Sequence, residues 1–379
     1  MQCLLAVCGI FLFCLYTGTH ALEEGDTCKF QKEPGVCLGY SKCRQVLESL
    51  EARITICTYN AQEAVVCCPS NYQDHLVKLR NEEAGLRISA KKCKDYARLA
   101  MPTQILSWLK PDTQLIQKRG NLCTTDNKLI VGGEAAQPGE FPHMVAIGYR
   151  RQHFTSGIDF NCGGSLISEN FVLTAGHCRT RDAFMVRLGS TELFGIAGDE
   201  PASDDYYIES FIKHPSYTIR NKYNDIALIK LMGMVRMSQR IRPACLYQST
   251  EVTEPKLIAI GYGALQSFGV SANRLMKVVL DQYNNEQCQQ VYQDLASQPS
   301  LAQGIHGSQL CAGYASGGHD TCQGDSGGPL QVRDKNEDCI FQLVAITSFG
   351  KVCGTTIPGV YTRISWYLDW IESIVWPPA

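Results

Sequence analysis

The chain has 379 residues, a length that allows two domains but not clearly three. Its 35 Lys and Arg nearly balance 37 Asp and Glu, and the net charge of −2 excludes bulk attraction to nucleic acid or to an anionic membrane. The 19 Cys are the most unusual feature of the composition.

Residues 1–21 have the pattern of a secretory signal peptide. A short apolar run from Leu4 to Tyr16 precedes Thr19 and Ala21, the small residues at positions −3 and −1 of a plausible cleavage site. The run is too short to span a bilayer comfortably, and no later stretch does better. The sequence therefore predicts a secreted, extracellular protein without a membrane span.

Cleavage of the signal removes three Cys (3, 8 and 14), so 19 − 3 leaves an even 16 in the mature chain. In an oxidising compartment this number indicates a disulfide framework. Metal ligation is the alternative, and the absence of paired CxxC motifs at zinc-ribbon spacing disfavours it.

Residues 28–68 hold six of these Cys within 41 residues. So small a segment buries little core and needs covalent staples. Six Cys allow 15 pairings, and the residues alone do not choose among them. The adjacent Cys67 and Cys68 cannot easily bond each other, so we expect them to anchor one strand at two places. Such a module serves either as a protein-docking domain or as a folded spacer, and the sequence leaves both open.

Residues 69–122 are polar and mixed in charge, and we interpret residues 69–129 as a linker and activation segment with one short helix near Ile88 to Leu99. Lys118-Arg119 is either a processing site or, more commonly for such a pair, a solvated basic patch.

From Leu129 onward, short apolar runs alternate with turn residues, which predicts an all-β domain. The predicted strands lie within 144–149, 164–176, 185–189, 225–231, 257–263, 275–280, 343–350 and 359–364. Residues 365–376 carry apolar side chains at helical spacing and predict a terminal helix docked on the barrel. These side chains are Trp366, Leu368, Trp370, Ile371, Ile374 and Val375.

Three polar residues stand in local patterns that favour nucleophilic catalysis. Ser326 lies in the Gly-rich turn TCQGDSGGPL, His177 in LTAGHC, and Asp225 at the start of DIALIKL. Each one alone is more often a turn, packing or strand-start residue. Together they supply the nucleophile, the base and the orienting carboxylate that acyl transfer from an amide requires.

The motifs IVGG (130–133), TAGHC (174–178), NDIAL (224–228) and GDSGGP (324–329) make residues 130–379 resemble a chymotrypsin-fold (S1) serine protease. This resemblance implies two six-stranded antiparallel β-barrels and a C-terminal helix. The six-Cys spacing of 28–68, which ends in CCP, resembles the clip domain of arthropod serine proteases. The whole chain thus resembles an arthropod clip-domain protease. Its resemblance to the snake- and persephone-like group is carried by the segments FPHMVAIGY, IRPACL, DTCQGDSGGP, ITSFGKVC and LDWIESIVWP.

The resemblance implies a role for each matching residue. Ser326 would be the nucleophile, His177 the general base and acid, and Asp225 the group that holds the His177 tautomer. The backbone N–H groups of Gly324 and Ser326 would form the oxyanion hole.

The primary specificity pocket would have Asp320 at its floor and Gly350 and Gly359 in its walls, which selects Arg or Lys at the scissile position. Three departures from the family pattern stand near the site: Gly176 in place of Ala, Tyr262 in place of Trp, and Phe349 in place of Trp on the aromatic wall that faces the substrate.

The IVGG motif implies a zymogen, in which cleavage after Leu129 frees the amino group of Ile130 to pair with Asp325. An unpaired buried charge is costly, so the two groups need each other. Because the cut follows Leu, we expect an upstream activating protease with chymotrypsin-like preference and no self-activation at this bond.

The resemblance also implies a disulfide pairing. The clip bonds would be Cys28–Cys67, Cys37–Cys57 and Cys43–Cys68, and the catalytic-domain bonds Cys162–Cys178, Cys288–Cys311 and Cys322–Cys353, with Cys123–Cys245 joining the linker to the catalytic domain. Subtraction leaves Cys93–Cys339 as a second tether.

The leading hypothesis is a trypsin-like endopeptidase that cuts downstream protease zymogens in an extracellular cascade of the immune, melanisation or Toll type, with serpins as inhibitors. The alternatives are a non-catalytic clip-protease homologue that acts as a cascade scaffold, and a digestive trypsin. We expect no cofactor; the acid-rich loop Asp199–Asp205 is a calcium candidate, although a solvated acidic loop is the favoured interpretation.

Overall fold

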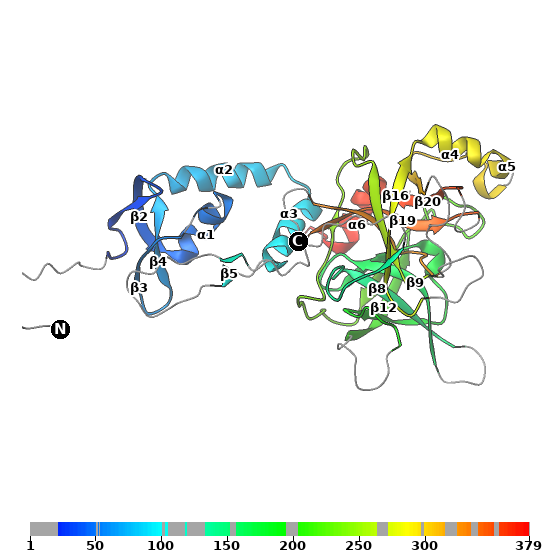
Figure 1. Cartoon of the computed structure of the whole chain (residues 1–379), viewed down its shortest axis with the longest axis horizontal. Coiled ribbons are helices and arrows are strands. Elements are labelled where there is room, and N and C mark those ends of the chain that lie inside the picture. The colour runs from blue at the N-terminus through cyan, green and yellow to red at the C-terminus, as the bar shows by residue number, and fades with distance from the viewer. Residues whose placement is uncertain are drawn as a thin grey trace, which may run out of the picture. The chain divides into compact units, whose positions relative to one another are not determined.

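The computed structural model forms two compact units, one of residues 1–85 and 103–118 and the other of residues 86–102 and 119–379 (Figure 1). It describes residues 22–378 except 51, 53, 101–102, 105–117, 120–132, 152–156, 195–203, 264–271, 297–298, 315–323, 335–339 and 352–355. The predicted signal peptide thus lies outside the described residues. No helix in the described ranges is long and apolar enough to cross a membrane.

The first unit is built on a four-stranded sheet of order β1-β2-β4-β3 with two helices (Figure 1). Its elements are β1 Thr27–Phe30, β2 Glu33–Gly39, α1 Tyr40–Ser49, β3 Ile56–Tyr59, β4 Ala64–Pro69 and α2 Tyr72–Ala84. A two-stranded pairing of β5 (Thr103–Gln104) with β6 (Lys118–Arg119) follows later in the chain. Strand β4 is buried along its whole length, since it lies between β2 and β3.

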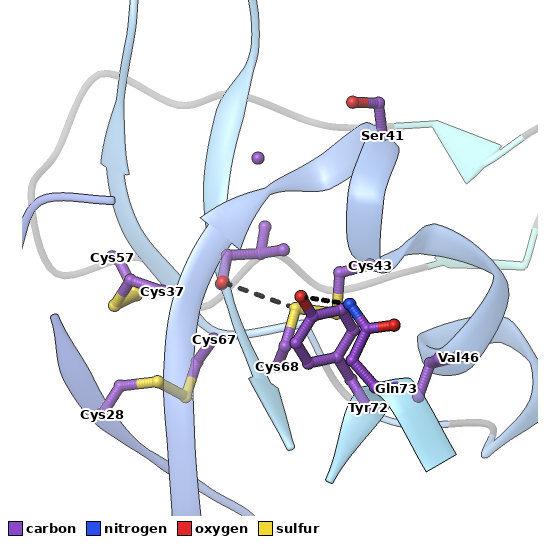
Figure 2. Close-up of a disulfide and its surroundings, with 12 residues drawn as sticks. Cys28, Cys37, Ser41, Cys43, Val46, Cys57, Cys67, Cys68, Tyr72 and Gln73 are labelled. Atoms are coloured by element: carbon purple, nitrogen blue, oxygen red, sulfur yellow. Dashed lines mark hydrogen bonds between the residues drawn. A yellow bond between two sulfur atoms is a disulfide. The ribbon is translucent and has the colours of Figure 1, made fainter. Parts of the chain in front are cut away.

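Three disulfides hold this small sheet, with the pairing that the clip resemblance implied: Cys28–Cys67, Cys37–Cys57 and Cys43–Cys68 (Figure 2). Successive side chains of a strand point to opposite faces. Cys67 of β4 therefore reaches β1, whereas its neighbour Cys68 reaches α1. The expectation that adjacent Cys anchor one strand at two places is confirmed.

The first barrel of the second unit is a closed ring of six antiparallel strands, in the order β10-β13-β12-β11-β8-β9. Its strands are β8 Met144–Arg150, β9 Ile158–Leu166, β10 Phe171–Thr174, β11 Ala183–Leu188, β12 Asp204–Lys213 and β13 Ala227–Leu231. Fully buried aliphatic side chains such as Ile147, Leu166 and Leu228 fill its core.

The second barrel closes because β19 pairs with both β18 and β20. Its ring consists of β15 Lys256–Gly261, β16 Met276–Tyr283, β17 Gln309–Gly313, β18 Pro329–Arg333, β19 Phe341–Phe349 and β20 Gly359–Arg363. Strands β7 (Glu134–Ala135) and β14 (Cys245–Leu246) extend it, and α4 (Asn285–Val291), α5 (Gln293–Ala296) and the 3₁₀ turn Pro299–Leu301 follow β16. The prediction of two six-stranded antiparallel barrels is confirmed.

The terminal helix docks on the core of the first barrel. A 3₁₀ turn, Ile364–Tyr367, leads into α6, Leu368–Val375. Leu368, Ile371 and Val375 are buried in the same cluster as the barrel strands. Trp366 departs from the prediction, because it falls in the 3₁₀ turn and is 53% exposed.

The expected helix of the linker is α3, Ile88–Ala100, and it belongs to the second unit. A disulfide joins Cys93 of α3 to Cys245 of β14. Two carboxylates also form hydrogen bonds with this segment. Glu372 of α6 accepts from Arg87 and, at 2.6 Å, from the Ser89 hydroxyl. Glu169 accepts from the hydroxyl of the buried Tyr96.

The bond between Cys93 and Cys245 shows that two expected pairings, Cys123–Cys245 and Cys93–Cys339, are wrong. Cys245 packs with Ile340 against Cys93 and Ala97 of α3, so the docked helix occupies the position that the activation segment was expected to take. Cys123 and Cys339 lie outside the described residues.

Two other catalytic-domain bonds, Cys162–Cys178 and Cys288–Cys311, are present as expected. The partners of the remaining expected bond, Cys322 and Cys353, lie outside the described residues.

Candidate active site

His177 and Asp225 form a doubly bonded pair at the rim of the first barrel. His177 lies in the 3₁₀ turn Gly176–Cys178, just after β10, and Asp225 lies just before β13. Nδ1 of His177 is 2.8 Å from Oδ2 of Asp225, and the backbone N–H of His177 donates to Oδ1 at 2.9 Å. A proton on Nδ1 satisfies the first bond and leaves Nε2 as an acceptor.

Two hydroxyl groups from the second barrel complete the surroundings of Asp225. Ser348 Oγ at the end of β19 donates to Oδ2 at 2.5 Å, and Thr362 Oγ1 in β20 donates to the backbone oxygen at 2.9 Å. Burial, the strongest influence, raises the pKa of Asp225, but the hydrogen bonds and charge of His177 and the bond from Ser348 together hold this pKa below its ordinary value. Asp225 is therefore ionised at neutral pH.

Sequence reasoning missed both Ser348 and Thr362. In the sequence, each of them is only a hydroxyl residue within a predicted strand, 343–350 or 359–364. The strand pairings within each barrel, such as β10 with β13 and β19 with β20, do not show which residues of the two barrels contact each other.

Ser326 lies in the turn that precedes β18, and left-handed glycines shape this turn. Gly324 has φ 99° and Gly327 has φ 78°, values that favour Gly. A Cβ at Gly327 would lie 2.2 Å from the Thr174 hydroxyl oxygen, so only Gly fits there. The Ser326 carbonyl accepts from Gly163 N–H at 2.8 Å, which ties the turn to β9 of the first barrel.

The disulfide Cys162–Cys178 connects these pieces. Sγ of Cys178 lies 3.6 Å from the carbonyl oxygen of Ser326, and both sulfurs lie within 4.8 Å of a ring nitrogen of His177. Because the two sulfurs are bonded to each other, they do not serve as metal ligands. The bond therefore brings the His177 turn, β9 and the Ser326 turn together.

The carboxylate of Asp325 is enclosed by backbone. It is 8% exposed, and Gly263 N–H donates to Oδ1 at 2.7 Å. A Cβ at Gly261 would lie 1.9 Å from Oδ1, and one at Gly263 would lie 2.4 Å from Oδ2. These two glycines thus provide the close approach that holds Asp325. Its expected partner Ile130 and the preceding Leu129 lie outside the described residues.

The two glycines assigned to the walls of the specificity pocket lie next to each other. A Cβ at Gly350 would be 3.9 Å from Cα of Gly359, and a Cβ at Gly359 would be 3.3 Å from the ring of the fully buried Tyr361. A side chain at Gly350 would therefore project toward β20. Asp320, the expected floor residue, lies outside the described residues.

Each departure from the family pattern has a structural counterpart. The ring of Tyr217 occupies the space beside Gly176, where a Cβ would lie 3.0 Å from two ring carbons. The buried Tyr262 donates its hydroxyl to the Ser190 carbonyl at 2.7 Å. The ring of Phe349, half-buried, meets the fully buried Tyr292 edge-on, with 6.0 Å between centroids.

One acidic residue of the calcium candidate loop, Asp205, forms an ion pair with an arginine. Asp205 begins the exposed side of β12, and its two carboxylate oxygens each accept from the Arg187 guanidinium at 2.8 Å. The residues from Asp199 to 203 lie outside the described ranges.

The sequence of the chain is similar to those of known serine proteases. The family model described as Trypsin matches residues 130–371. Serine protease snk of Drosophila melanogaster is 37% identical over 367 residues, which cover 94% of this chain and 80% of that protein.

Two further relatives come from other arthropods. The proclotting enzyme of Tachypleus tridentatus is 30% identical over 373 residues, or 92% of this chain and 90% of that protein. CLIP domain-containing serine protease C9 of Anopheles gambiae is 34% identical over 256 residues, or 65% of this chain and 68% of that protein.

Proposed function

Because this chain belongs to the trypsin family, among the arthropod clip-domain serine proteases, we propose that it is the secreted zymogen of a trypsin-like endopeptidase. Cleavage after Leu129 would activate it, and the active form would cut after Arg or Lys in downstream protease zymogens of an extracellular cascade. The observation that carries the proposal is the doubly bonded His177–Asp225 pair beside the Ser326 turn.

The site residues have the chemistry for acyl transfer. His177 Nε2 would take the proton from Ser326 Oγ as the hydroxyl attacks the substrate carbonyl, and it would then deliver this proton to the leaving amine. The buried, ionised Asp225 would orient the ring and stabilise the imidazolium. The N–H groups of Gly324 and Ser326 would bind the oxyanion, and removal of one such donor typically costs about 3–4 kcal/mol of transition-state stabilisation.

Activation would depend on Asp325. Its enclosure by Gly261 and Gly263 leaves the carboxylate adjacent to the turn that carries Ser326, so an ammonium brought to it would order that turn. The pocket wall glycines Gly350 and Gly359, with Asp320 at the floor, would accept an extended basic side chain.

The partners follow from this role. The activator would be a protease that cuts after large apolar residues, the substrate another zymogen with a basic activation site, and the inhibitors serpins. The sequence similarity to a proclotting enzyme supports a place in a proteolytic cascade.

Labelling with an active-site serine reagent tests the proposal. We expect the intact chain to label weakly, and the chain cut after Leu129 to label fully and to hydrolyse arginyl and lysyl peptides. A Ser326→Ala variant cut in the same way should do neither. A correctly cut wild-type chain that neither labels nor hydrolyses would instead favour the non-catalytic scaffold.

A second comparison tests the position of the activating cut. Trypsin should cut after Lys128, which leaves Leu129 ahead of Ile130 and should give little activity. Full activity after a clean cut at Lys128 would contradict the assignment of Ile130.

A further inference from the structure

A lysine ammonium lies over the aromatic residue beside the candidate active site. Nζ of Lys222 is 5.3 Å from the centroid of the Phe349 ring. Phe349 directly follows Ser348, whose hydroxyl bonds Asp225, and Lys222 stands three residues before Asp225 in the chain. The cation and the ring therefore come from the two segments that meet at this carboxylate.

The backbone of Lys222 is fixed from both sides. Its N–H donates to the Ser300 carbonyl at 2.9 Å, and its own carbonyl accepts from Nε2 of Gln309 at 2.9 Å. The next residue, Tyr223, donates its hydroxyl to the Gly304 carbonyl at 2.9 Å. A fixed backbone reduces the conformational entropy that the ammonium loses when it binds a partner.

The side chain of Lys222 is exposed, and no carboxylate within the described ranges forms an ion pair with it. A second lysine on this aromatic surface differs in that respect. Lys351 lies 5.2 Å from the centroid of Tyr292, but its ammonium already bonds Asp294 at 2.6 Å and the Val291 carbonyl at 2.8 Å. The ammonium of Lys222, unlike that of Lys351, can therefore form an ion pair with a carboxylate of a bound molecule.

We propose that Lys222 selects substrates with Asp or Glu two to four residues before the scissile bond. The inference rests on the proposed function, which seats the scissile residue beyond Gly350. Phe349 stands between Ser348 and Gly350, so the substrate chain that leads to the pocket crosses this ring and passes the ammonium. An ion pair at an exposed site is worth up to about fivefold in binding and weakens with salt.

The test compares kcat/KM for arginyl peptides that carry Glu, Gln or Lys at each of these three positions. We expect the activated wild type to prefer Glu over Gln by about three- to fivefold at one position, and added NaCl to reduce this preference. Lys222→Met, which keeps the apolar stem, should abolish the preference, and Lys222→Glu should favour Lys instead. Arg220→Met is the matched control, since Arg220 is an exposed cation of the same loop, and it should keep the preference for Glu.

Equal kcat/KM for Glu, Gln and Lys at all three positions would overturn the inference while the proposed function stands, and so would a preference that survives in Lys222→Met. Failure of every arginyl peptide to react would count against the proposed function. Binding of fluorescent Glu and Gln peptides to cleaved Ser326→Ala separates the two cases, because it needs no catalysis. Equal affinities there would also overturn the inference.

Discussion

The hydroxyl oxygen of Ser348 lies 2.5 Å from Oδ2 of Asp225, the oxygen that also meets Nδ1 of His177. We expect Ser348→Ala to lower kcat/KM about tenfold, since a hydrogen bond to a charged group is worth about 1.5–3 kcal/mol. Asp225→Asn should cost far more, about 10⁴ in kcat, because it favours the wrong His177 tautomer. Steady-state kinetics with an arginyl peptide measures both.

Ser348→Thr provides the matched control, because it keeps the hydroxyl and should retain more activity than Ser348→Ala. Loss of the Ser348 bond also removes one of the influences that lower the pKa of Asp225. Equal activities of the Ala and Thr variants would show that packing, and not the hydrogen bond, is what matters at this position.

The contact between Gly176 and Tyr217 predicts a steric coupling next to His177. Gly176→Ala places a methyl group 3.0 Å from the Tyr217 ring, so we expect a loss of about 1 kcal/mol in the free energy of unfolding and a few-fold loss of activity. The double variant Gly176→Ala/Tyr217→Ser should recover much of both losses. A double-mutant cycle without coupling would show that the loop moves aside freely.

The burial of His143 predicts a stability change in mildly acidic solution. Burial lowers the pKa of His143 from 6.5 to about 4, and Nε2 lies 2.6 Å from the Gln331 side-chain oxygen. The unfolded chain therefore takes up a proton below about pH 6.5 that the folded chain does not bind until about pH 4. The contribution of this group to stability is complete above pH 6.5 and falls by about 3 kcal/mol between pH 6.5 and 4.

The measurement is the thermal unfolding midpoint across this pH window for the wild type and for His143→Gln. We expect a flatter pH dependence in the variant, whatever its absolute stability. Asp225 acts at lower pH, because its pKa is depressed and its contribution is lost only on further acidification. Parallel curves for the two proteins would rule out His143 as the source of the slope.

The bond between Cys93 and Cys245 leaves Cys123 and Cys339 without their expected partners. We predict that these two bond each other, since removal of the predicted signal peptide leaves an even number of Cys and Cys322–Cys353 is expected from the family resemblance. Peptide mapping under non-reducing conditions should recover the Cys93–Cys245 and Cys123–Cys339 peptides. A free thiol at either Cys123 or Cys339 would contradict the second pairing.

The sequence was informative where chemistry and local pattern coincide. The motifs around His177, Asp225 and Ser326 predicted the catalytic domain, and long apolar runs predicted strands such as β8 and β19. Strand β12 was missed because it begins with two aspartates and two tyrosines, and Glu209 and Ser210 then interrupt its apolar residues, so it has no long apolar run. The role of Ser348 depends on the meeting of two barrels, and the partner of Cys93 on the docking of α3, so neither is visible in a local pattern.

The covalent link between α3 and β14 changes what a cut after Leu129 would release. Residue 93 precedes that cut and residue 245 follows it, so the severed molecule stays in one piece. A ligand held by the six-cysteine module would then remain at high effective concentration near the protease that it accompanies, whatever the dilution of the surrounding fluid.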